Sequence, residues 1–164
     1  MANVDLTGKR VLIIGAETAT GRAIATHLAG AGARVAVIGT ATDGDTPFAM
    51  KRLSRKLGGP GQAIDGTNDM AVRVMVRQIS KELGSLDAIV CAAPEAGPLI
   101  TRHGGKELDR SGGKHLVYIG ERPRDVEAPE KRPSWLAVTV HDSGNAELIA
   151  EEVARTISGG KLLD

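Results

Sequence analysis

The first half of the chain alternates short apolar runs with longer segments in which apolar residues recur at helical spacing. Near-continuous apolar runs are typical of parallel strands that are buried on both faces of a sheet. Such runs, the third of them brief, lie at residues 11–14, 34–39, 62–65 and 86–93. We therefore expect four buried strands in this half.

Helical periodicity fills the three intervals between these runs. The first helix is expected from Gly21, and its inward positions are Ile24, His27, Leu28 and Ala31. The second has Thr46 as its N-cap and Pro47 in its first turn. The third has Thr67 or Asn68 as its cap, and its apolar stripe consists of Val72, Met75, Val76, Ile79 and Leu83.

Strands that alternate with helices across short connections predict a parallel sheet with helices on its faces. Right-handed crossovers give the strand order 3-2-1-4, and ligands then bind at the carboxyl ends of the strands. Residues 115–120 and 135–141 predict strands 5 and 6, and residues 145–159 predict a final amphipathic helix. The expected fold is a single α/β domain over residues 1–164, a Rossmann-like doubly wound parallel sheet of order 3-2-1-4-5-6.

Helical cover over strands 4 to 6 is expected to be reduced on one face. Residues 94–113 predict only a short helix, interrupted by Gly104 and Gly105. Residues 121–134 are charged and contain three prolines, so no regular helix is expected there. Strands this apolar need cover on both faces. We therefore expect this face to dock on a partner, either a second copy or a full-length relative, in a homo- or hetero-oligomer.

Composition narrows the classes of function. Lys and Arg together number 21 and Asp and Glu 20, for a net charge of +1, and the only aromatic residues are Phe48, Tyr118 and Trp135. Both features argue against a nucleic-acid partner. A single cysteine, Cys91, fits a reducing compartment. No apolar segment has the length of a signal core or a membrane span, so we expect a cytoplasmic protein without membrane insertion.

Residues 6–39, LTGKRVLIIGAETATGRAIATHLAGAGARVAVIG, resemble the start of the short-chain dehydrogenases/reductases. The family's loop, Thr-Gly-x-x-x-Gly-x-Gly, corresponds here to Ile14, Gly15, Ala19 and Gly21. Asp65 stands at the family's acidic position after strand 3, and residues 91–94 stand where the family has Asn-Asn-Ala-Gly. Residues 1–95 match well as a dinucleotide-binding half, and residues 96–164 match loosely as a shortened second half.

The resemblance implies that the loop binds NAD or NADP. Loop amides and the following helix N-terminus approach the pyrophosphate, and Ala19 is tolerable there if its backbone angles are negative. The candidate cofactor-binding residues are Gly15, Glu17, Thr18, Ala19, Thr20, Gly21, Thr40, Asp65, Gly66, Ala92 and Ala93. The alternative is a loop that only turns the chain from strand to helix.

The choice between NAD and NADP depends on the end of strand 2. NAD-specific members of the family have an acid there, where this chain has Gly39. NADP-specific members have a basic residue there or in the loop, where this chain has Thr40 and Thr18. Glu17 is expected close to the adenosine ribose, where it would repel a 2′-phosphate. The alternative is that Glu17 is a solvated carboxylate of the loop. The sequence therefore gives a marginal preference for NAD.

The catalytic groups of the family do not transfer to this chain. Its enzymes use a Ser after strand 5 and Tyr-x-x-x-Lys on the next helix, whereas strand 5 here ends in Ile119 and Gly120. Tyr118, the only tyrosine, lies within that strand, and its spacing to Arg122 is interpreted as chance. The favoured function is a non-catalytic nucleotide-binding or assembly subunit. Two alternatives stay open: an active oxidoreductase with atypical or partner-supplied residues, and a structural subunit with an empty pocket.

Three further groups of residues are interpreted as structural. His141, Asp142 and Ser143 are consecutive, which favours a helix-capping turn over a catalytic relay. Cys91 is expected to be a small buried residue. The four histidines have no metal-ligand spacing, so no metal site is expected.

Overall fold

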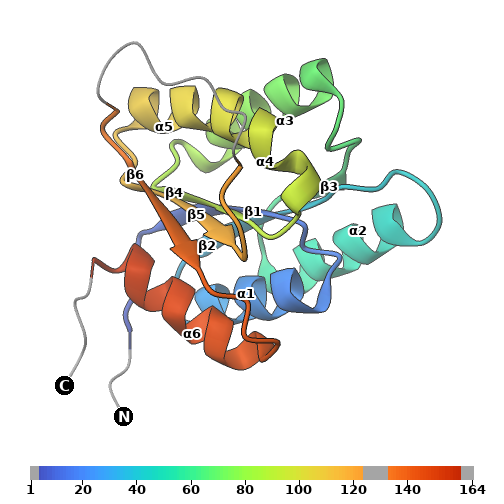
Figure 1. Ribbon diagram of the computed structural model, residues 1–164. Coiled ribbons are helices and arrows are strands. Elements are labelled where there is room, and N and C mark those ends of the chain that lie inside the picture. The colour runs from blue at the N-terminus through green and yellow to red at the C-terminus, as the bar shows by residue number, and fades with distance from the viewer. Residues whose placement is uncertain (1–3, 124–132, 160–164) are drawn as a thin grey trace.

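The computed structural model describes residues 4–123 and 133–159, and it places six parallel strands in one sheet (Figure 1). The sheet order is β3-β2-β1-β4-β5-β6, as the crossover rule predicts. The strands are β1 (Arg10–Ile14), β2 (Arg34–Gly39), β3 (Gly61–Ala63), β4 (Ala88–Cys91), β5 (His115–Ile119) and β6 (Leu136–Val140). The prediction of a Rossmann-like α/β fold is confirmed.

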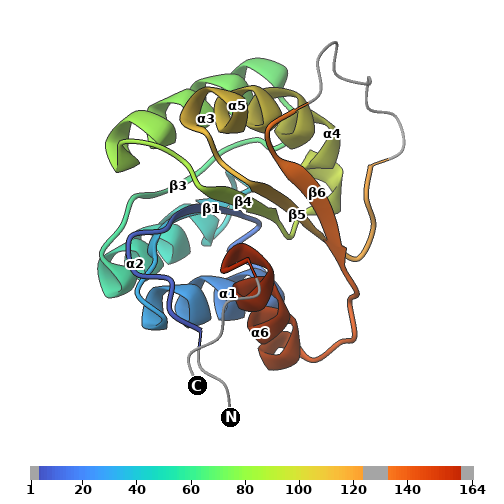
Figure 2. The same ribbon diagram turned by 90° about the vertical axis from the view of Figure 1, so that its left-hand side faces the viewer.

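Helices cover both faces of the sheet (Figures 1 and 2). One face carries α1 (Ala19–Gly30), α2 (Thr46–Leu57) and α6 (Ala146–Ile157). The other face carries α3 (Asp69–Leu83) and a continuous helical segment made of a 3₁₀ turn, a short α-turn, a π-turn and a last helix. These four pieces are η1 (Pro94–Ala96), α4 (Gly97–Leu99), η2 (Ile100–Gly104) and α5 (Gly105–Ser111).

The strands are buried on both faces, which explains their near-continuous apolar sequences. In β1, Val11 and Ile13 belong to the core beneath α1, α2 and α6, whereas Leu12 and Ile14 belong to the core beneath α3 and α5. Successive side chains of a strand point to opposite faces, so each strand contributes to both cores. The sheet is therefore a rigid support whose strand ends position the loops that follow them.

Helix caps follow the predicted residue types, with small shifts in position. Asn68 caps α3 and Asn145 caps α6, each accepting a hydrogen bond from a backbone amide of the first turn. Thr46 is not an N-cap, because α2 begins at Thr46 and Asp45 precedes it without a side-chain cap bond. The first helix begins at Ala19 rather than at Gly21, with Thr18 as its N-cap.

The prediction that glycines interrupt the helix within residues 94–113 is wrong. Gly104 and Gly105 both lie inside the helical segment. A Cβ at Gly104 would lie 2.8 Å from Cδ1 of Ile89, and one at Gly105 would lie 2.7 Å from Cζ2 of Trp135. The low helix propensity of glycine is thus outweighed by the close packing that it permits.

The reduction in helical cover is confined to the β6 edge. On the α3 face, the side chains of β4 and β5 are buried, including Leu116 and Tyr118. On β6, Thr139 is exposed on the α3 face, and Leu136, which alternation places on the opposite face, is 66% exposed. Residues 121–123 and 133–134 form no helix, and the rest of the predicted irregular segment lies outside the described residues.

Candidate functional site

The loop after β1 and the first residues of α1, together residues 15–21, require glycine at both ends of this segment. Gly15 has a φ of 86°, and a Cβ on it would lie 2.9 Å from the carbonyl carbon of Ala92 and from the nitrogen of Ala93. A Cβ on Gly21 would overlap the carbonyl oxygen of Gly15. We call residues 15–21 the glycine loop. It brings the start of α1 close to the ends of β1 and β4.

Thr18 holds the glycine loop in place from within. Its hydroxyl donates to the carbonyl of Gly15 at 2.8 Å and accepts from the amide of Gly21 at 2.9 Å. Ala19 is the first residue of α1, and no described residue other than glycine has a positive φ, so its methyl group causes no backbone strain. The amides of Ala19 and Thr20 donate to no described residue, which leaves them available to an anion at the helix N-terminus.

The ends of β2 and β3 lie beside this loop. A Cβ on Gly66 would lie 3.1 Å from Cβ of Thr40 and 3.2 Å from Cβ of Ala96, so these residues are closely packed. Asp65 is exposed, and its Oδ1 accepts from the amide and the hydroxyl of Thr67. These two hydrogen bonds lower the pKa of Asp65, the side-chain bond more than the backbone bond.

Glu17 connects the glycine loop to the end of β2. The amide of Thr40 donates to Oε2 of Glu17 at 2.6 Å, and the Thr40 hydroxyl donates to the same oxygen at 3.1 Å. Oε1 of Glu17 is buried and has no hydrogen-bond partner among the described residues. Glu95, which the sequence did not single out, lies in η1 with its Oε1 3.5 Å from the Thr40 hydroxyl. Its only sequence signal is its position just after strand 4.

Tyr118 is engaged with the helical segment on the α3 face. Its hydroxyl lies 2.5 Å from Oγ1 of Thr101, which donates its own proton to the carbonyl of Gly97 at 2.8 Å. Tyr118 is therefore the donor of the pair. Burial raises the pKa of Tyr118, against smaller opposing effects of the Thr101 hydrogen bond and the Arg122 charge. This tyrosine stabilises the packing of β5 against the helical segment.

The remaining candidate groups occupy structural positions. Cys91 is buried, and burial raises the pKa of its thiol to about 11. Asp142 accepts from the amide of Gly144, and Ser143 accepts from the amide of Asn145, as in the predicted capping turn. Across residues 4–123 and 133–159, no group of three or more His, Cys, Asp or Glu residues is placed to hold a metal ion. Within the same ranges, no helix combines the length and apolar character that a membrane crossing needs.

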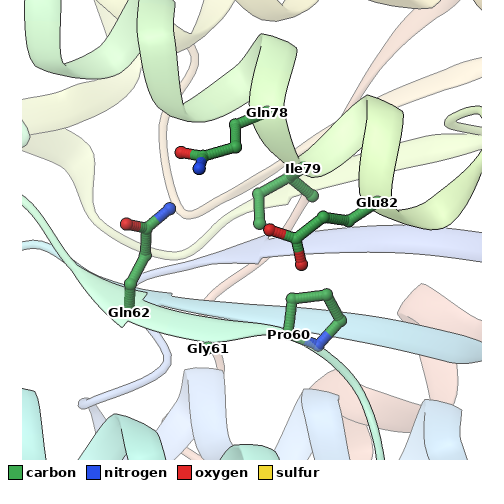
Figure 3. A pocket seen from close by; sticks show the side chains of 6 residues that line it. All are labelled: Pro60, Gly61, Gln62, Gln78, Ile79 and Glu82. Carbon is green, nitrogen blue, oxygen red and sulfur yellow. The ribbon is translucent and has the colours of Figure 1, made fainter.

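A pocket of about 150 Å³ lies away from the glycine loop, between β3 and α3 (Figure 3). The lining residues are Pro60, Gly61, Gln62, Gln78, Ile79 and Glu82. Figure 3 shows the side chains of Gln62 and Gln78 extending toward one another from the strand and the helix. None of the predicted cofactor-binding residues lines this pocket.

Comparison with known proteins identifies one family. The family described as short chain dehydrogenase matches residues 9–110, more than half of the chain. A short-chain type dehydrogenase/reductase from Mycobacterium marinum is 26% identical with a TM-score of 0.58, over 71% of this chain and 57% of that one. No curated protein matches the sequence.

Two further structures show the fold alone. A ribose-5-phosphate isomerase from Brucella melitensis is 20% identical with a TM-score of 0.63, over 73% of this chain and 54% of that one. A 7α-hydroxysteroid dehydrogenase complexed with NADH and 7-oxo glycochenodeoxycholic acid is 20% identical with a TM-score of 0.60, over 73% and 55%. The chain thus spans little more than half the length of the structures it resembles.

Proposed function

Because the chain belongs to the short-chain dehydrogenase family, we propose that it is a nucleotide-binding subunit that holds NAD(H) in the glycine loop without catalysing hydride transfer on its own. The observation that carries the proposal is the geometry of the loop. Gly15 has the left-handed backbone that the turn needs, and Gly21 lies against the carbonyl of Gly15. The amides of Ala19 and Thr20 are available to the pyrophosphate.

The non-catalytic part of the proposal is supported by the residues around β5. The family's serine position is taken by the end of the strand at Ile119 and Gly120. Tyr118 donates its proton to Thr101 rather than facing a ligand. Pro123, which follows β5, packs against Gly97 at the start of α4. A Cβ on Gly97 would lie 2.7 Å from Cγ of Pro123. An active oxidoreductase that uses residues of a partner is the alternative.

The preference for NAD over NADP is supported by two carboxylates at the end of β2. Glu17 is hydrogen-bonded to Thr40, and Glu95 lies 3.5 Å from the Thr40 hydroxyl. A 2′-phosphate would add further negative charge beside them, and like charges at short range repel. The unphosphorylated ribose of NAD brings hydroxyl donors instead, which carboxylate oxygens accept.

The subunit is further proposed to associate with a second copy along β6. Among the described residues this strand ends the sheet, and Leu136 at its start is 66% exposed. An open strand edge with an exposed apolar residue is a template for pairing with another strand. Pairing of β6 with β6 of a second copy is self-complementary, as a two-fold dimer interface must be.

A calorimetric titration tests the proposed function directly. NAD, NADP and ATP are titrated separately into the purified chain, and oxidation of NADH is followed with a panel of ketones and aldehydes. We expect heat of binding for NAD, weaker binding for NADP and no turnover. Hydride transfer by the chain alone would overturn the non-catalytic assignment. If no nucleotide binds, the chain is a structural subunit with an empty pocket.

A further inference from the structure

Two hydrogen-bond donors at the end of β2 converge on a single point. The backbone amide of Thr40 and its hydroxyl both donate to Oε2 of Glu17, at 2.6 and 3.1 Å. Convergent backbone and hydroxyl donors of this kind bind anions, because each one is oriented toward the same negative charge. We call these two donors the Thr40 cradle.

The occupant of the Thr40 cradle is part of the chain itself. Glu17 reaches it from the glycine loop and leaves its second oxygen, Oε1, buried without a partner among the described residues. An unsatisfied buried carboxylate oxygen costs free energy, so a donor that reached it would be bound favourably. Glu95 approaches the same hydroxyl from η1 but accepts nothing from the Thr40 amide, and it is exposed.

Packing explains why the carboxylate comes from the glycine loop rather than from the end of β2. A Cβ at Gly39 would lie 2.7 Å from Cγ2 of Thr46 and 3.0 Å from Cγ of Met50. The first turns of α2 therefore leave no room for an acidic side chain at the position where NAD-specific members of the family have one. Glu17 supplies negative charge to the adjacent residue instead.

We propose that Glu17 determines nucleotide specificity by occupying the Thr40 cradle. Because Glu17 fills the cradle, the two donors of Thr40 are not available to a 2′-phosphate, and the Glu17 carboxylate accepts a ribose hydroxyl of an unphosphorylated adenosine. This inference rests on the proposed nucleotide-binding function. It adds the residue that distinguishes an adenosine with a 2′-phosphate from one without it. Occupancy of the Thr40 cradle differs from simple charge repulsion of the 2′-phosphate. Under repulsion alone, removing Glu17 or removing Glu95 would have the same effect on affinity.

The test uses 5′-AMP and 2′,5′-ADP, which differ at the 2′-phosphate and lack nicotinamide. Each is titrated calorimetrically into the full chain and into three variants: Glu17→Ala, Glu95→Ala, and Glu17→Ala combined with Thr40→Val. We expect Glu17→Ala to bind 2′,5′-ADP about tenfold more tightly and 5′-AMP about threefold more weakly than the wild type. Adding Thr40→Val removes the hydroxyl donor, leaves the amide donor, and should cancel part of the gain.

Glu95→Ala is the matched control, because it removes a carboxylate near the same hydroxyl and leaves the Thr40 cradle filled. We expect it to change the affinity for 2′,5′-ADP by less than about threefold. Equal gains in the Glu17 and Glu95 variants, or no gain in Glu17→Ala while thermal unfolding shows it folded, overturn the inference. If Glu17→Ala does not fold, the inference is judged on Glu17→Ser, whose short side chain leaves the Thr40 cradle empty and for which the same gain in 2′,5′-ADP affinity is expected.

The two proposals fail in distinguishable ways. A wild-type chain that binds 5′-AMP and NAD, with no gain for 2′,5′-ADP in Glu17→Ala, retains the proposed function and loses the specificity role of Glu17. A wild-type chain that does not bind NAD, together with a Glu17→Ala variant that binds 2′,5′-ADP, loses the proposed function and retains the Thr40 cradle. If no nucleotide binds to any variant, both proposals are overturned.

Discussion

Trp135, which precedes β6, lies against the backbone of Gly105 in α5, so closely that a Cβ on Gly105 would be 2.7 Å from Cζ2 of the indole. The contact joins the last strand of the sheet to the helical segment that covers β4 and β5. It places an aromatic side chain over part of a face for which the sequence predicts too little helical cover.

A methyl group at this contact is expected to destabilise the fold. Gly105→Ala should lower the free energy of unfolding by about 1–3 kcal/mol, because overpacking forces Trp135 or α5 to move. Lys106→Ala, at the next and exposed position, should change it by less than about 0.5 kcal/mol. Urea denaturation followed by Trp fluorescence measures both. A Gly105→Ala chain as stable as the wild type would contradict the contact.

The Tyr118–Thr101 hydrogen bond is expected to contribute to stability and not to nucleotide binding. Tyr118→Phe should cost about 1 kcal/mol of unfolding free energy, since it removes the donor of a part-buried hydrogen bond. A double-mutant cycle with Thr101→Val isolates the pair, and we expect a coupling energy of about 0.5–1.5 kcal/mol. Tyr118→Phe should bind NAD as the wild type does in calorimetry. Loss of NAD binding would place this tyrosine in the nucleotide site.

Two glycines of α1 provide a matched pair for testing the glycine loop. Gly21→Ala should reduce NAD affinity by about tenfold or more, because a Cβ there overlaps the carbonyl of Gly15. Gly30→Ala, where a Cβ meets no atom within 4 Å, should leave NAD affinity unchanged and stabilise the fold by up to about 1 kcal/mol. Unchanged NAD binding by folded Gly21→Ala would show that the nucleotide binds elsewhere.

Association along β6 should be sensitive to charge at its exposed apolar position. Leu136→Lys is expected to convert dimers to monomers, because it replaces an exposed apolar side chain at the strand edge with a charged one, and a charged edge residue opposes strand pairing. Leu148→Lys on α6, at a residue 54% exposed and outside the strand edge, is the control and should leave the dimer intact. Light scattering at micromolar concentration distinguishes the two states. A strictly monomeric wild type would refute the assembly.

The hydrogen bond between Asp69 of α3 and His103 of η2 should make stability depend on pH in the acid range. Nε2 of His103 lies 2.9 Å from Oδ1 of Asp69, and this hydrogen bond is the main cause that lowers the pKa of Asp69 below 3.8. A lowered carboxyl pKa contributes stability that is present above about pH 4 and is lost as the pH falls through the native value. His103→Ala should therefore raise the pKa of Asp69.

Carboxyl-carbon NMR titration of Asp69 measures that pKa in the wild type and in His103→Ala. Urea midpoints between about pH 5 and pH 3 should fall less steeply in the variant, because the difference between folded and unfolded pKa is smaller. Arg102→Ala is the control, since Arg102 lies 3.5 Å from the same carboxylate and contributes less to the shift. An identical Asp69 titration in both chains would contradict the His103 contact.

The strand order could be predicted from the sequence because it depends on features that are local or general. Apolar runs mark strands such as β1 and β2, periodic stripes mark helices such as α3, and the handedness of crossovers then fixes the order. The helical segment through Gly104 and Gly105 could not be predicted in this way. Its stability depends on Ile89 and Trp135, which are distant in the sequence.

In the candidate site, too, features made by neighbouring residues could be predicted and contacts between distant residues could not. The glycine loop was predictable because its residues follow one another and the motif has a direct steric meaning at Gly15 and Gly21. The hydrogen bond from Thr40 to Glu17 was not, because it joins loops that follow different strands. Glu95 was missed for the same reason, since only the fold brings η1 to the end of β2.

The hydroxyl of Thr18, which bridges Gly15 and Gly21, has a consequence for the thermodynamics of binding. Because this bridge joins the two ends of the loop through a side chain of the loop itself, it restrains the loop to one conformation. A preorganised loop loses little conformational entropy on binding, so more of the interaction free energy appears as affinity. Thr18→Ala should therefore weaken binding through a less favourable entropy, although Thr18 itself need not touch the nucleotide.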